Sequence, residues 1–180
     1  MTRLTFTNAR IVDPATGRDE IGSLCVHNGT IVAGGPDFIA DETIDCAGRV
    51  LAPGLIDLKV STGEPGDEHR ETIASAGRAA AAGGVTTICI QPDTDPVLDD
   101  PALIEFVARA PCAVRVLPMG ALTQGLKGEK MSEMALMAAA GAVAFTEGDA
   151  SIANTRVMRR ALSYAATFDL LVAVHAEDPF

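Results

Sequence analysis

Short apolar runs alternate with longer segments of mixed composition in the part of the chain that follows residue 54. We interpret the apolar runs as strands at residues 55–60, 85–90, 113–118, 142–145 and 170–174. We interpret the segments between them as helices at residues 71–82, 101–109, 129–140 and 154–168. Strands that alternate with helices predict a parallel sheet with helical crossovers. An open doubly wound sheet and part of a closed β/α barrel fit this pattern equally well.

Residues 1–52 show a different pattern, in which shorter apolar runs are separated by turns. The expected strands are 4–7, 9–12, 21–27, 31–33, 44–46 and 49–51. Asn28-Gly29 is a strong two-residue hairpin turn, because both residues tolerate positive φ. The pattern therefore predicts a boundary between a small β segment at 1–52 and an α/β segment at 53–180.

The strand at 55–60 has one apolar and one polar face, because side chains alternate along a strand. The apolar face carries Ile56, Leu58 and Val60, and the polar face carries Asp57, Lys59 and Ser61. This division is typical of the first strand of a β/α barrel, in which helices cover the outside and chemistry takes place at the carboxyl ends of the strands.

Composition narrows the possible partners and compartments. A net charge of −10 and a pI of about 4.6 argue against nucleic acid or an anionic membrane as the main partner. No apolar run is long enough to cross a membrane, and the N-terminus has no signal-peptide core, so we expect a cytoplasmic protein. The four cysteines form no Cys-x-x-Cys pair, which favours reduced thiols over a disulfide or a zinc cluster.

The run PGLIDLKVSTGEPG, residues 53–66, resembles the start of the barrel in dihydroorotases, which are members of the metal-dependent amidohydrolase superfamily. The family pattern at this point is PG-(L/F)-(I/V)-D-x-H-x-H-x-R-EPG. The segments AAAAGGVTT, GALTQGLKG, GAVAF and HAED also match, so that the resemblance extends from about residue 4 to residue 178. It implies an α/β protein with the N-terminal half of a (β/α)8 TIM-type barrel, strands one to five, at 53–180. A small β-sandwich segment at 1–52 would precede it.

Compared with the family, three barrel strands and the C-terminal segment of the sandwich are missing. An open barrel would leave unpaired backbone and an apolar face exposed. We therefore expect these 180 residues to be a fragment of a longer protein. A partner chain that completes the barrel is the alternative.

The resemblance also shows which functional groups have been replaced. The family's His-x-His pair supplies two metal ligands and its Arg holds the substrate carboxylate, and these places are taken here by Lys59, Ser61 and Gly63. The loop after strand two, where the family has an Asn that binds substrate, carries Asp93. The matched metal-ligand position at the end of strand five is kept as His175. One imidazole does not make a zinc site, and a lone His at a strand end is more often structural.

The ligand position after strand four matches either Glu147 or Gly148, depending on the register. We expect the ammonium of Lys59 to occupy the old metal region and to pair with a carboxylate of Asp57, Asp93 or Glu147, unless it extends into solvent. Ser61 as a nucleophile with Lys59 as its base is a weaker alternative, because nothing else indicates an oxyanion hole.

These replacements imply a dihydroorotase homologue of pyrimidine biosynthesis that is catalytically inactive and needs no cofactor. The segment 161–170 looks closest to the pseudo-dihydroorotase branch. Members of that branch support the assembly of aspartate carbamoyltransferase, so this enzyme is the expected partner and an oligomer the expected state. The alternative is an active, zinc-dependent cyclic amidase that converts L-dihydroorotate and water into N-carbamoyl-L-aspartate. Stoichiometric zinc would favour the alternative.

Overall fold

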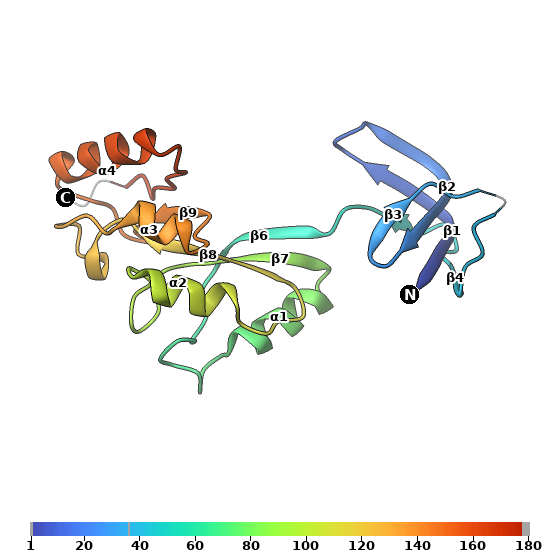
Figure 1. The fold of residues 1–180 in the computed structure, drawn as a ribbon, viewed down its shortest axis with the longest axis horizontal. Coiled ribbons are helices and arrows are strands. Elements are labelled where there is room, and N and C mark those ends of the chain that lie inside the picture. The colour runs from blue at the N-terminus through green and yellow to red at the C-terminus, as the bar shows by residue number, and fades with distance from the viewer. Residues whose placement is uncertain (1, 36, 178–180) are drawn as a thin grey trace. The chain divides into compact units, whose positions relative to one another are not determined.

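A computed structural model describes residues 2–35 and 37–177. The chain divides into two compact units, Met1–Pro53 and Gly54–Phe180 (Figure 1). Each unit has a sheet of its own. Among the described residues, no helix is both long enough and apolar enough to cross a membrane.

The first unit is built around one long strand. Its strands are β1 Arg3–Asp13, β2 Arg18–His27, β3 Thr30–Val32, β4 Glu42–Asp45 and β5 Val50–Leu51. β1 pairs antiparallel with β2 and parallel with β4 and β5. The two strands expected at 4–7 and 9–12 are thus one strand, whose register shifts between Phe6 and Ala9. The five described strands of this unit are hydrogen-bonded into one sheet.

The predicted hairpin turn is confirmed. Asn28 and Gly29 have φ values of 50° and 77°, and they connect β2 to β3 with His27 paired to Thr30. Asn and Gly are the residues that adopt such values at least cost, so the sequence determines this turn locally.

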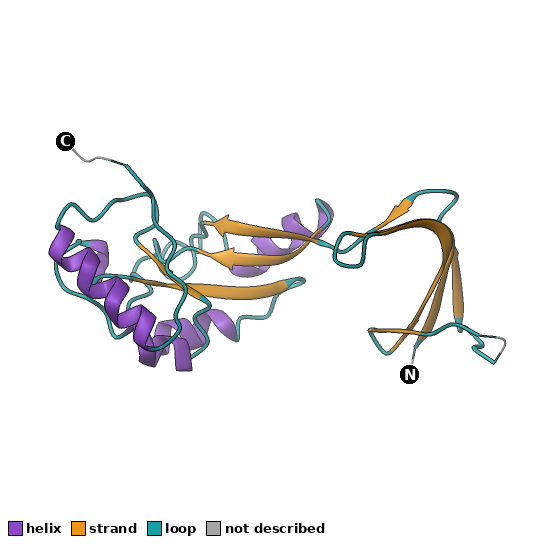
Figure 2. Ribbon diagram, turned by 90° about the horizontal axis from the view of Figure 1, so that it is seen from above, coloured by secondary structure: helices purple, strands orange, loops and turns teal. Residues whose placement is uncertain are grey.

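The second unit is an α/β unit with a parallel sheet. Its strands are β6 Leu55–Val60, β7 Val85–Ile90, β8 Arg115–Ala121 and β9 Ala144–Thr146. Its helices are α1 Ile73–Ala82, α2 Pro101–Ala108, the short 3-10 helix η1 Gln124–Leu126, α3 Met134–Ala139 and α4 Thr155–Thr167. The strands are hydrogen-bonded in the order β6-β7-β8-β9, and the sheet curls into half a barrel (Figure 2). The barrel alternative is therefore favoured over an open doubly wound sheet.

The main core lies between the sheet and helices α1 to α4. Ile88, Ile90 and Phe145 of the strands are almost fully buried in it, together with Ile104 of α2 and Ala161 of α4. The other face of the sheet carries a smaller cluster of Cys89, Met119 and Ala144. Apolar burial of this kind is worth about 1.5–3 kcal/mol for each large side chain, so the one-sided core dominates the stability of the unit.

Two expected elements are shorter in the structure. The helix expected at 129–140 begins only at Met134, because Ser132 is bound to the end of β8 through its hydroxyl, which donates to the carbonyls of Ala121 and Leu122. The strand expected at 170–174 is reduced to one parallel bridge between Val172 and Phe145.

The expected cover over the apolar face of β6 is also incomplete. Val60 packs against the main core, but Ile56 and Leu58 of this face are 61% and 66% exposed. No described helix covers them, because α1 packs against β7 and not against β6. Within the described residues β6 is paired on one side only, so it is an edge strand.

The first helix of this unit depends on a capping box at its N-terminus. Thr72 accepts a hydrogen bond from the amide of Ser75 at 3.1 Å, and the Ser75 hydroxyl accepts one from the amide of Thr72 at 3.0 Å. Thr72→Ala should lower the free energy of unfolding by about 1 kcal/mol. The measurement is the urea unfolding midpoint, followed by helical circular dichroism. Thr155→Ala, at the first position of α4, is the control and should have a smaller effect, and an equal effect would contradict the role of the cap.

Candidate functional site

The candidate site lies where the strands of the second unit end. Because the strands are parallel, their carboxyl ends meet at one rim of the sheet. Lys59 and Ser61 come from the end of β6, Asp93 from the loop after β7, and Glu147 from the loop after β9. The local sequence explains this placement in part, since polar residues follow the last apolar residue of β6 and of β7 directly.

Lys59 forms an ion pair with a carboxylate of this rim, but not with one of those expected. Its ammonium donates to Asp149, while its backbone amide donates to Asp57 at 3.0 Å. Both side chains of the ion pair are exposed, at 58% and 76%. The hydrogen bond from Lys59, followed by its charge, lowers the pKa of the Asp149 carboxyl. The expected partners Asp57, Asp93 and Glu147 were therefore wrong.

The residues that follow β9 line two separate hollows. Thr146 and Gly148 line a hollow together with Lys59, whereas Glu147 lines a separate pocket. Glu147 consequently points away from Lys59, and Asp149 is the carboxylate that the ammonium reaches.

Ser61 forms a hydrogen bond with Asp93 of the loop after β7. Its hydroxyl donates to the carboxylate of Asp93 at 2.7 Å, and this bond connects the end of β6 to the loop after β7. Lys59, the base that a nucleophilic serine would need, already donates its ammonium to Asp149. The arrangement therefore gives no support to Ser61 as a nucleophile.

The turn at Gly63 leaves no room for a side chain. A Cβ atom there would lie 2.2 Å from the carbonyl oxygen of Asp67 and 2.9 Å from that of Glu71. Both neighbours are backbone atoms, and the Asp67 amide also donates to the Gly63 carbonyl at 2.5 Å. An arginine at position 63 would require this turn to adopt another path.

The neighbouring Glu-Pro-Gly motif has a structural role in this chain. The Glu64 carboxylate accepts a hydrogen bond from the Ile73 amide at 2.8 Å, at the N-terminus of α1. A negative charge is favourable there because the first amides of a helix lack partners within it. At Gly66, with φ of 106°, a Cβ atom would lie 1.6 Å from the Asp95 carbonyl oxygen. The motif thus fastens the loop after β6 to α1 and to the loop after β7.

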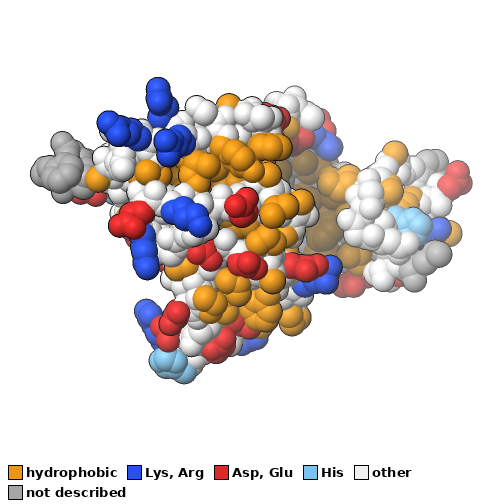
Figure 3. All heavy atoms as spheres, turned by 60° about the vertical axis from the view of Figure 1, so that its left-hand side comes forward, with side chains coloured by type: hydrophobic (Ala, Val, Ile, Leu, Met, Phe, Trp, Pro, Cys, Tyr) orange, Lys and Arg blue, Asp and Glu red, His pale blue; other side chains and the backbone are white. Residues whose placement is uncertain are grey.

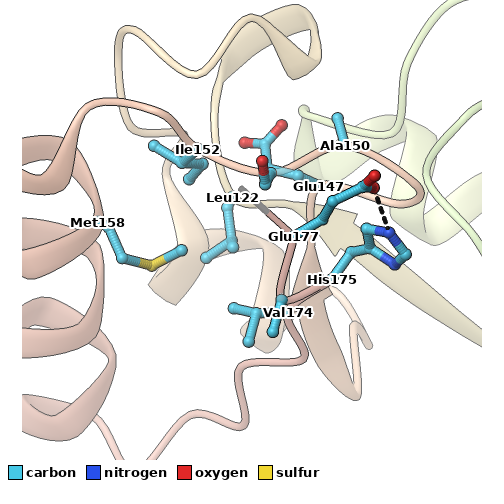
Figure 4. Close-up of a pocket in the computed structure, with 10 residues that line it drawn as sticks. Leu122, Glu147, Ala150, Ile152, Met158, Val174, His175 and Glu177 are labelled. Atoms are coloured by element: carbon cyan, nitrogen blue, oxygen red, sulfur yellow. Dashed lines mark hydrogen bonds and ion pairs between the residues drawn. The ribbon is translucent and has the colours of Figure 1, made fainter. Parts of the chain in front are cut away.

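Glu147 is the most unusual carboxylate of the rim. It is only 5% exposed, and neither of its oxygens has a hydrogen-bond partner of normal geometry in the described part of the chain. Burial raises the pKa of its carboxyl, and the nearby hydroxyl and amide of Thr123 offset part of this rise. Figure 4 shows it beside a cavity of about 190 Å³ that Leu122 and Met158 also line.

His175 lines the same cavity but binds a different carboxylate. Its Nε2 lies 2.9 Å from Glu177, two residues further along the chain (Figure 4). Across residues 2–35 and 37–177, no three His, Cys, Asp or Glu side chains gather in a way that could hold a metal ion. Lys59 and Ser61 offer no imidazole on β6, so the residues present do not fit a binuclear metal centre.

One polar residue of the rim was not singled out by sequence reasoning. Gln91 is 5% exposed, and its side-chain amide donates to the Leu58 carbonyl at 3.5 Å and contacts the Met119 sulfur at 3.2 Å. It links β6, β7 and β8 at their carboxyl ends. A glutamine directly after the apolar run 85–90 was the available signal.

The buried Glu147 carboxyl should make stability depend on pH. A carboxyl whose pKa is raised by folding holds its proton more tightly in the folded state, so stability is lost as the pH rises from the unfolded value of about 4.3 through the folded value. Glu147→Gln removes this loss. It should raise the unfolding free energy by about 1–3 kcal/mol near neutral pH and by much less near about pH 4.

Urea denaturation at the two pH values measures this difference. Glu129→Gln changes an exposed carboxylate in the same unit and should have little effect at either pH. A gain from Glu147→Gln that is the same at both pH values, or a loss near neutral pH, would show that the buried carboxyl carries no such cost.

Comparison with known proteins agrees with this architecture. The protein is 46% identical to a "Dihydroorotase-like protein" of Pseudomonas aeruginosa over 181 residues, which are 97% of this chain and 43% of that protein. It is 41% identical to a "Dihydroorotase" of Solibacter usitatus over 180 residues, 97% of this chain and 42% of the relative. The chain thus spans less than half the length of these relatives.

Solved structures show the same fold. An L-hydantoinase from Arthrobacter aurescens matches 99% of this chain with a TM-score of 0.82 at 24% identity, and the match covers 41% of the hydantoinase. A D-hydantoinase from Bacillus sp. AR9 matches 97% of this chain with a TM-score of 0.73 at 20% identity, over 40% of its own length. The family model described as "Dihydro-orotase-like" matches residues 48–179, which is well over half of the chain. The chain therefore belongs to the dihydroorotase-like family of the amidohydrolase superfamily.

Proposed function

We propose that this dihydroorotase-like protein of pyrimidine biosynthesis is catalytically inactive and supports the assembly of aspartate carbamoyltransferase. The observation that carries the proposal is the ion pair between Lys59 and Asp149, at the place where the family has its first metal-binding histidine. Relatives of this chain are named both "Dihydroorotase-like protein" and "Dihydroorotase". The argument therefore rests on the site and not on those names.

The donors at the end of β6 are unsuited to activating water. In the family's chemistry, metal ions lower the pKa of a bound water so that it becomes a nucleophile near neutral pH. The ammonium of Lys59 donates to Asp149 and has no lone pair for a metal ion, which it would also repel. The Ser61 hydroxyl donates to Asp93 and is a poor ligand in its neutral form.

The positions that bind substrate in the family also carry residues that are unsuited to an acidic substrate. Carbamoyl aspartate and dihydroorotate carry carboxylates, which the family holds with an arginine at the position of Gly63. The turn around Gly63 has no space for a side chain. The carboxylate of Asp93 replaces a neutral amide and would repel an acidic substrate. Restoring the metal ligands alone would therefore leave the substrate unbound.

Assembly is a role that such a protein can perform without a metal ion. It requires only a folded scaffold and a surface for the partner, and both survive the loss of the rim chemistry. The main core of the second unit contains none of the replaced residues Lys59, Ser61, Gly63 and Asp93. The cytoplasm, where pyrimidine biosynthesis supplies the partner, is the location that we propose.

A second candidate function is a zinc-dependent cyclic amidase with a divergent site. Two observations favour it. His175 stands at a matched ligand position, and Glu147 is a buried carboxylate without a normal hydrogen bond among the described residues. Metal content separates the two functions, because the amidase requires bound zinc.

The protein should not interconvert carbamoyl aspartate and dihydroorotate. Lys59→His combined with Ser61→His should not restore the reaction. Gly63 still offers no side chain to bind the substrate carboxylate, and Asp93 still repels it. The measurements are a spectrophotometric assay of dihydroorotate and the zinc content of the purified protein. Turnover on the order of 1–1,000 per second with stoichiometric zinc would establish the amidase instead. Lys59→Gln is the control, and it should leave the absence of activity unchanged.

The protein should co-elute with aspartate carbamoyltransferase in size-exclusion chromatography at low salt. Because charged surfaces steer such associations, added salt should weaken the complex. The purified proteins are mixed at micromolar concentrations and compared with each protein run alone. Two separate elution profiles at low salt would count against the assembly role.

A further inference from the structure

The exposed side of α4 carries a cluster of positive charge, formed by Arg156, Arg159 and Arg160. The face drawn in Figure 3 shows Lys and Arg side chains gathered at its upper left. The helix sequence TRVMRRALSYAAT contains no acidic residue. In the part of the chain that the structure describes, none of the three guanidinium groups lies within 4.0 Å of a carboxylate.

This cluster contrasts with the rest of the protein. The whole chain has a net charge of −10. The adjacent segment 127–133 has two lysines and two glutamates and adds no net charge. Arg156 and Arg160 stand four residues apart on one helix face, where like charges repel each other and destabilise the helix. The described residues offer nothing that offsets this repulsion, so a binding partner with negative charge is its natural counterpart.

The fold itself does not require the arginines. α4 is held against the sheet by its other side, where Val157, Ala161 and Ala165 are buried. The charges therefore lie on the side of the helix that is free for contact.

A groove lies beside the arginines on the surface of α4. It measures about 460 Å³ and is lined by Arg159, Arg160, Ser163, Tyr164, Thr167 and Met131. Guanidinium groups bind carboxylates through paired hydrogen bonds. The hydroxyls can form hydrogen bonds with a peptide backbone. The Tyr164 ring, tilted against Phe168 with the ring centroids 4.9 Å apart, offers an apolar surface. This combination suits an extended polypeptide with acidic side chains better than a small anion, which would use only the arginines.

We propose that this surface of α4, formed by the three arginines and the groove, is a docking surface for an acidic segment of a partner protein. The inference deepens the proposed function and rests on it only for the identity of the partner. The partner would bind the basic surface of α4 on an otherwise acidic protein, and the negative charge of the contact would come from the partner.

The test uses the full chain and a fluorescein-labelled peptide of ten glutamates as the probe. Fluorescence anisotropy at low salt should show binding, although the net charge of the protein opposes it. The triple variant Arg156→Gln, Arg159→Gln, Arg160→Gln should weaken binding by about tenfold or more. The control triple variant Arg49→Gln, Arg78→Gln, Arg115→Gln removes the same charge from exposed positions elsewhere and should stay within about twofold of the unchanged protein.

Three results would overturn the inference. The unchanged protein does not bind the peptide, or both triple variants weaken binding equally, or inorganic phosphate at constant ionic strength displaces the peptide completely. The last result would indicate a site for small anions. Circular dichroism of both variants confirms that they fold, which is expected because none of the six arginines is buried.

Co-elution with aspartate carbamoyltransferase separates this inference from the proposed function. If the α4 variant co-elutes as well as the unchanged protein does, the proposed function stands and the docking surface lies elsewhere. If neither co-elutes, the proposed function fails, and the peptide measurement alone decides the inference. Loss of co-elution in the α4 variant, with retention in the control variant, supports both.

Discussion

Burial on one side of the parallel sheet is the constraint on which the second unit depends. Helices α1 to α4 all contribute to the core formed with Ile88, Ile90 and Phe145, so every crossover returns on the same side. The strands are consequently parallel, and their carboxyl ends meet at one rim. Because that core contains none of Lys59, Ser61, Gly63 and Asp93, these rim positions can change while the fold persists. On the proposed function, this separation would let the chain keep its fold while Lys59 and Ser61 stand in the place of metal-binding groups.

The replacements are not isolated changes on an unchanged surface. Lys59 and Ser61 are each bound to an acidic residue of another loop, Asp149 and Asp93. The turn at Gly63 closes so tightly that only a glycine fits, while Glu64 and Gly66 keep the loop attached to α1 and to the loop after β7. The residues at these positions therefore form hydrogen bonds and an ion pair with one another and with neighbouring loops. A single substitution toward the family pattern would therefore break one of these contacts without forming a metal site.

Much of the fold could be predicted from the sequence, and the failures have physical causes. The strands at 55–60 and 85–90 were predicted with their observed limits, because Gly-rich turns precede them and polar residues follow them. The start of α3 was misjudged because Ser132 binds the end of β8, a tertiary contact that local composition does not reveal. At the site, Lys59 was expected to form an ion pair and does so. Its partner was missed because Asp149 stands 90 residues away in the sequence, and only the folded chain brings it to Lys59.

The two groups of positive charge in this unit differ in how the fold treats them. Lys59 is balanced within the chain by Asp149, in an exposed ion pair that is worth about 0–1 kcal/mol, so its contribution to stability is small. The arginines of α4 are neither balanced among the described residues nor needed for packing, because Val157, Ala161 and Ala165 hold the helix. The like charges of these arginines repel one another, and an acidic partner bound to α4 would reduce that repulsion. On the proposed function, the protein would act through α4, whose arginines lie apart from the rim residues Lys59, Ser61 and Asp93.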